Sequence, residues 1–120
     1  MGKFSIRKRL RSFRFAFRGI SFFFKNEHNV WIHLLATIVV VAVGICFDIS
    51  HNDWIAITLA IGLVFVAEAL NTAVEQLADS ITQEPNKYIE KAKDVAAGAV
   101  LIAAIVAIVI AIIVFVPITF

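Results

Sequence analysis

An uninterrupted apolar run at residues 95–116 constrains the fold of this chain more than any other feature, because it contains no charged or polar side chain. An α-helix of about 20 apolar residues spans the hydrocarbon core of a bilayer. Two further apolar blocks, at residues 31–47 and 54–67, precede this run, and 61% of all 120 residues are hydrophobic. A soluble domain of this size could not bury so much apolar surface. The sequence therefore predicts one all-α membrane domain over residues 1–120, with three transmembrane helices at about residues 30–48, 53–80 and 93–116.

The N-terminal segment is basic and amphipathic instead. Residues 1–25 contain eight Lys or Arg residues and no acid. Basic and apolar side chains recur at helical spacing on two different faces: Arg7, Arg11, Arg14 and Arg18 on one, Phe13, Phe17, Ile20 and Phe24 on the other. This pattern predicts an amphipathic surface helix at residues 1–29, lying on an anionic membrane surface rather than on nucleic acid. The helix either anchors and orients the chain or grips phosphate through its arginines.

The distribution of positive charge predicts the orientation in the membrane. The turn at residues 48–53 has no Lys or Arg, whereas Lys87, Lys91 and Lys93 lie around the second turn. Loops rich in Lys and Arg stay in the cytoplasm. We therefore expect the N-terminus and the second turn on the cytoplasmic side of a bacterial inner membrane, and the first turn and C-terminus outside. Cys46 is the single cysteine, which excludes a disulfide within the chain.

A polar stripe interrupts the second apolar block. Glu68, Asn71, Glu75 and Asp79 are spaced by three, seven and eleven residues from the first, so they lie close together on one helix face. Glu68 follows 14 uncharged residues. A carboxylate inside a membrane segment costs at least ~2.5 kcal/mol on insertion scales, and such residues usually mark functional sites. The stripe predicts a site for a cation and a polar substrate at the cytoplasmic membrane edge.

The acids permit phosphoryl transfer to a lipid hydroxyl. Glu27, Glu75 and Asp79 are hard oxygen donors, and magnesium takes one or two carboxylates together with substrate phosphates. Glu68 lies about two helical turns deeper than Glu75, where a buried carboxylate could take a proton from a hydroxyl at headgroup level.

The polar groups near these acids suit a nucleotide phosphate. Asn71 can donate to a phosphate oxygen or hold Glu68 in place. Lys93, next to Asp94 at the start of the third span, can neutralise phosphate charge, and phosphoryl transfer needs little beyond positioning and electrostatics. A glycine-rich phosphate loop is missing from the sequence, so a nucleotide site of the soluble-kinase type is not indicated.

Two other functions fit the same residues. Acids in a span also mark ion paths, so the chain could be a small ion-coupled transporter. It could also be a non-enzymatic subunit of a membrane assembly. In that case Glu75 and Asp79 are a solvated helix end, and the three histidines are interfacial or packing residues. Three helices can scarcely enclose a water-accessible site alone, which favours an oligomer.

The motifs resemble the prokaryotic diacylglycerol kinase family, which includes the undecaprenol kinases. Residues 68–79 carry Glu-x-x-Asn-x-Ala-x-Glu-x-x-x-Asp, and Ala-Lys-Asp follows at residues 92–94. Arg18-Gly19 and Asn26-Glu27 also fit, so the resemblance covers nearly the whole chain. It implies an ATP- and magnesium-dependent lipid kinase with a surface helix and three transmembrane helices, assembled as a homotrimer whose sites are shared between subunits.

The resemblance also implies roles by position. Glu68 would be the general base, and Glu27 and Glu75 would bind the metal. The residues that would contact or orient the nucleotide are Asn71, Asp79, Glu84, Lys93, Asp94, Arg14 and Arg18.

One motif departs from the family pattern, and another indicates a branch. Family members often have Glu-Tyr-His in the second turn, where this chain has Glu84-Pro85-Asn86, so the base of the nucleotide would be held differently. Ile32-His33-Leu34-Leu35 and the Ala-Ala-Gly-Ala run at residues 96–99 resemble the undecaprenol kinase branch more than the enterobacterial one.

Overall fold

The computed structural model describes residues 5–119, and the predictions for residues 1–4 and 120 lie outside this range. The chain forms four α-helices: α1 (Ile6–Asn26), α2 (His28–Cys46), α3 (His51–Ile81) and α4 (Lys87–Thr119). By length and composition, α2, α3 and α4 can each cross a membrane. The predicted fold class, a surface helix followed by three transmembrane helices, is confirmed. α4 begins at Lys87, six residues before the predicted start of the third transmembrane helix at about residue 93.

Polar side chains cap the helices where the sequence changes character. Ser50 Oγ accepts the Asp53 backbone N–H at 3.1 Å and begins α3. Asn86 Oδ1 accepts the backbone N–H groups of Tyr88 and Ile89 at 3.0 and 3.2 Å and begins α4. These side-chain oxygens satisfy N–H groups that lack partners within the helix.

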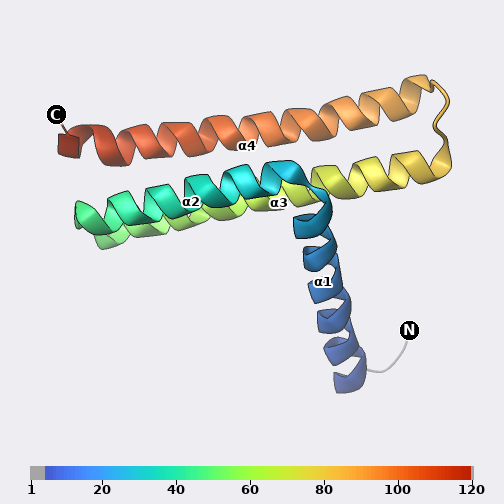
Figure 1. The fold of residues 1–120 in the computed structure, drawn as a ribbon, viewed down its shortest axis with the longest axis horizontal. Helices are drawn as coiled ribbons and strands as arrows, with labels where there is room; N and C mark the ends of the chain where they lie inside the picture. Colours follow the sequence, from blue (N-terminus) through green and yellow to red (C-terminus); the bar gives the residue numbers. More distant parts are fainter. Residues whose placement is uncertain (1–4, 120) are drawn as a thin grey trace.

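A single residue, Glu27, separates α1 from α2. The break between the helices is therefore shorter than the polar run at residues 26–29. The backbone of Glu27 is extended (φ −109°, ψ 110°), and α1 turns away from the other helices there (Figure 1). Aromatic contacts hold this corner. Trp31 Nε1 donates to the Phe24 carbonyl at 3.0 Å, and the Phe24 ring stacks on Phe65 of α3 with centroids 6.3 Å apart.

The helices α2, α3 and α4 run alongside one another, each antiparallel to the next in the chain (Figure 1). The buried apolar side chains between them form two small clusters, Ile49, Ile57 and Val114 in one and Val64, Ala67 and Ala103 in the other. Most other apolar side chains face outward, as expected where lipid is the solvent.

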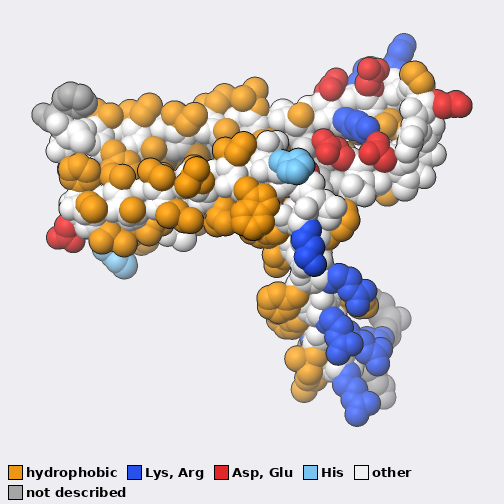
Figure 2. Space-filling view, in the orientation of Figure 1, with side chains coloured by type: hydrophobic (Ala, Val, Ile, Leu, Met, Phe, Trp, Pro, Cys, Tyr) orange, Lys and Arg blue, Asp and Glu red, His pale blue; other side chains and the backbone are white. Residues whose placement is uncertain are grey.

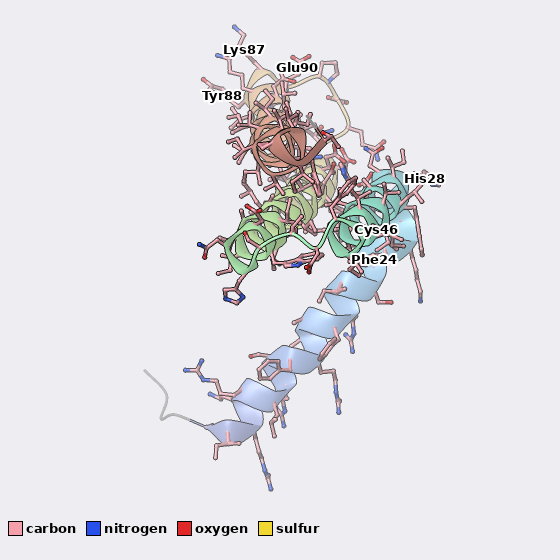
Figure 3. All side chains as sticks on the ribbon, turned by 90° about the vertical axis from the view of Figure 1, so that its left-hand side faces the viewer. Phe24, His28, Cys46, Lys87, Tyr88 and Glu90 are labelled. Carbon is pink, nitrogen blue, oxygen red and sulfur yellow. The ribbon has the colours of Figure 1, made fainter. Side chains whose placement is uncertain are left out.

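Charge is segregated on the surface of the molecule. Basic side chains line one side of α1 and apolar ones the other, while acidic side chains gather where α3 turns into α4 (Figure 2). Lys87, Tyr88 and Glu90 point outward from the start of α4, and His28 lies on the outer side of α2 (Figure 3). The end of the molecule where α3 turns into α4 therefore carries acidic and basic side chains that could meet a charged ligand.

Candidate functional site

The deepest acid of the stripe, Glu68, is buried at 4% exposure and paired with a residue from another helix. His33 Nε2 on α2 lies 2.8 Å from Glu68 Oε1. Burial of an isolated carboxylate would be costly, so this contact offsets part of the cost. The carboxylate predicted as the base is thus held at the α2–α3 interface.

Thr72 connects Glu68 to the corner between α1 and α2. Its hydroxyl lies 2.8 Å from Glu27 Oε2 and 3.1 Å from the Glu68 backbone carbonyl, and shares its hydrogen between them. Because Thr72 sits one helical turn after Glu68, this contact brings Glu27 beside the same stretch of α3. The structure therefore places two of the predicted site acids, Glu27 and Glu68, around one buried hydroxyl.

Asn71 and Glu75 lie one turn apart on α3. Asn71 Nδ2 is 3.4 Å from Glu75 Oε1, a long hydrogen bond, and Asn71 Oδ1 is buried with no partner within residues 5–119. A buried acceptor without a partner costs about 1–3 kcal/mol. Such a group calls for a partner, and an ion or ligand bound at the site would supply one.

The end of the stripe nearest the α3–α4 turn carries an ion pair between helices. Lys93 Nζ on α4 lies 2.8 Å from Asp79 Oδ1 on α3, with side chains 40% and 52% exposed. Both residues line a hollow of about 440 Å³ at the α3–α4 turn, together with Glu84. Asp94, next to Lys93, is exposed. Exposed ion pairs contribute little to stability, so this pair is available to exchange partners with a ligand.

Arg14 and Arg18 are not brought to the carboxylates within one chain. Both are exposed on α1, which runs away from the other helices (Figure 1). The Arg18 guanidinium lies 5.5 Å from the centroid of the Phe15 ring on the same helix. A role for these arginines at the site would need a second chain or a movement of α1.

A preformed protein cage for a metal is not found: within residues 5–119, no three or more His, Cys, Asp or Glu side chains are arranged to hold an ion. Magnesium does not need one, since it usually takes one or two carboxylates and completes its shell with phosphate oxygens and water. Glu27 and Glu75 are donors of the right chemistry, and Thr72 engages only Oε2 of Glu27. The residues therefore fit a metal that arrives with a phosphate ligand.

An apolar groove of about 290 Å³ reaches His33 from the membrane side. It runs between α2, α3 and α4, and small side chains such as Ala60, Ala104 and Ala107 form much of its wall. His33 and Thr37 are the polar residues along it. The partner of the buried acid thus also borders an apolar space.

Two residues of this cluster, His33 and Thr72, were not predicted as site residues. The sequence predicts an interfacial or packing role for His33, although it is the one histidine inside the first apolar block. Ionisable residues within spans usually pair with each other, so His33 and Glu68 could have been paired on that ground. Thr72 follows Glu68 by four residues and so shares its face, but threonine is common in spans and gave no distinct signal.

The chain is similar in sequence to known proteins of one family. Residues 14–115 match the family described as prokaryotic diacylglycerol kinase. Undecaprenol kinase of Bacillus subtilis is 36% identical over 107 residues, which cover 89% of this chain and 87% of that protein. Diacylglycerol kinase of Synechocystis sp. is 36% identical over 97 residues, 80% of this chain and 55% of that protein. Diacylglycerol kinase of Escherichia coli strain K12 is 28% identical over 92 residues, 77% of this chain and 75% of that protein.

Proposed function

The chain belongs to the prokaryotic diacylglycerol kinase family, and we propose that it transfers the γ-phosphate of ATP to the hydroxyl of a membrane lipid in a magnesium-dependent reaction. It is a multi-pass membrane protein and a lipid kinase, a phosphotransferase with an alcohol acceptor. The names of the relatives make diacylglycerol and undecaprenol the two candidate acceptors. Membership of this family favours a kinase over the transporter and assembly alternatives.

The buried carboxylate of Glu68 is the observation that carries the proposal. It contacts His33, which lines an apolar groove that can take the acyl or isoprenoid chain of a lipid and so bring the lipid hydroxyl near Glu68. Glu68 takes the proton of the lipid hydroxyl, the hydroxyl oxygen bonds to the γ-phosphorus, and the bond from phosphorus to the β–γ bridging oxygen breaks. The products are a lipid phosphate and ADP.

The other carboxylates bind the phosphate end of the nucleotide. Glu27 and Glu75 would hold magnesium, which would neutralise the charge of the phosphates. Seven side chains contact or orient the nucleotide: Asn71, Asp79, Glu84, Lys93 and Asp94 from α3, α4 and the turn between them, and Arg14 and Arg18 from α1. The arginines reach the site in a homotrimer whose sites are shared between subunits. The whole site faces the cytoplasm at the bacterial inner membrane, where ATP is available.

The test is phosphate transfer by the purified protein in bilayers, with labelled ATP, magnesium and either diacylglycerol or undecaprenol. We expect label in at least one lipid. Glu68→Gln should lower turnover by about 10²–10⁴-fold, because the base is lost, while helical content and ATP binding persist. Asp48→Asn is the matched control, since it makes the same carboxylate-to-amide change in the exposed first turn.

Three results would count against the proposal. Absence of label in both lipids, with folded protein, would exclude these two acceptors and the proposed reaction with them. Near-normal transfer by Glu68→Gln would exclude Glu68 as the base. Equal losses in Glu68→Gln and Asp48→Asn would show a general effect on folding instead.

A further inference from the structure

The imidazole of His33 is the one side-chain partner recorded for the Glu68 carboxylate within residues 5–119. We propose that His33 is a positioning residue for the base: it fixes the direction of the carboxylate toward the acceptor hydroxyl. This inference rests on the proposed function of Glu68 and deepens it.

The contact assigns different tasks to the two carboxylate oxygens. A carboxylate that acts as a base is ionised and only accepts hydrogen bonds, so His33 Nε2, 2.8 Å from Oε1, is the donor in the state that reacts. Oε2 is left to accept the hydrogen of the lipid hydroxyl, from an orientation that the imidazole sets.

The surroundings leave His33 as the group that orients this carboxylate. Glu68 is buried, and the Thr72 hydroxyl reaches its backbone carbonyl rather than its carboxylate. The contact with His33 is therefore the polar contact that sets the direction of the Glu68 side chain within residues 5–119.

The ring of His33 is itself held in place. It packs edge-on against Phe65 of α3, with centroids 6.4 Å apart and an interplanar angle of 70°. Its backbone carbonyl accepts the Thr37 hydroxyl at 2.7 Å. His33 also lines the apolar groove. An acceptor chain in the groove would therefore lie against the same imidazole that contacts the Glu68 carboxylate.

The experiment measures kcat and the KM values for ATP and lipid in four single variants and one double variant. In His33→Phe we expect kcat to fall by about 10²-fold, the cost of a misplaced catalytic group, with KM for ATP unchanged. His33→Gln should recover a large part of the loss, because its amide keeps an N–H donor. His51→Phe makes the same change in an exposed residue at the opposite end of the bundle and should leave kcat unchanged.

The fourth variant tests whether His33 acts through Glu68. Glu68→Asp retains a carboxylate but withdraws it from the imidazole by one methylene. If the two residues act as a unit, adding His33→Phe to Glu68→Asp should lower kcat little further.

Each contrary result has one meaning. A wild-type kcat in His33→Phe would overturn the inference, and so would full additivity of the two changes. Equal losses in His33→Phe and His33→Gln, with lowered thermal stability in both, would indicate a packing role and also overturn it. If the wild-type protein phosphorylated no lipid, the proposed function itself would fail, which is a separate outcome from any of these.

Discussion

At the scale of single residues, the site uses the same kind of contact twice: a carboxylate is joined to a polar side chain on another element. The buried Glu68 meets His33 across the α2–α3 interface, and the half-buried Glu27, at the corner between α1 and α2, meets Thr72 of α3. The two partners in each contact are 35 or more residues apart in the sequence. The depth of Glu68 in an apolar run was enough to predict its importance. The pairing of ionisable residues within spans makes His33 a candidate partner. Helix spacing does not give the contact itself, because it relates residues along one helix and says nothing of how neighbouring helices are aligned.

Glu75 tests the proposed metal role at the same scale. Glu75→Gln removes one of two proposed hard ligands, so the magnesium concentration for half-maximal activity should rise by about tenfold or more, while saturating magnesium restores part of the rate. The measurement is a magnesium titration of lipid phosphorylation at fixed ATP, with Asp48→Asn as the control. A titration curve that matches the wild type would rule out Glu75 as a metal ligand.

At the scale of helices, the apolar blocks predict the number and order of the elements, and the structure confirms them. The corners were less predictable. Glu27 alone separates α1 from α2, because aromatic packing between Phe24, Trp31 and Phe65 allows a sharper turn than the polar residues at 26–29 suggest. The turn between α2 and α3 likewise depends on a close approach that spacing does not reveal.

Gly44 permits that close approach and gives a prediction about the α2–α3 hairpin. A Cβ atom there would lie 2.7 Å from the Trp54 ring and 3.2 Å from Ile49 Cδ1. Gly44→Ala should therefore destabilise the protein by about 1–3 kcal/mol, the usual cost of overpacking. Thermal unfolding in detergent measures the effect.

Gly62→Ala is the matched control, because a Cβ atom at Gly62 meets nothing within 4 Å. Alanine is the better helix former by about 1 kcal/mol, so this variant should be as stable as the wild type or more so. Equal melting temperatures for Gly44→Ala and the wild type would show that Trp54 moves aside at no cost.

At the scale of the whole molecule, one chain leaves parts of the proposed site apart. α1 carries Arg14 and Arg18 away from the other helices, and apolar side chains cover much of the outer surface (Figure 2). Lipid accounts for the apolar surface, and a homotrimer would return α1 of one chain to the carboxylates of another. The relation between chains is invisible to sequence spacing, so the family resemblance rather than the residues suggested the trimer.

The proposed orientation is a property of the whole chain and can be tested without any assay of activity. Cys46 is the only cysteine, so Cys46→Ser gives a background for single labels. Asn52→Cys reports on the α2–α3 turn and Gln83→Cys on the α3–α4 turn, and both residues are exposed. In intact bacterial spheroplasts, a membrane-impermeant maleimide should label Asn52→Cys and spare Gln83→Cys, whereas lysis should expose both. The reverse labelling pattern would place Glu68, Asp79 and Lys93 on the side of the membrane without ATP. Positive charge around α1 and α4 is what predicts the orientation, so the reverse pattern would also mean that these charges do not determine the topology of this protein.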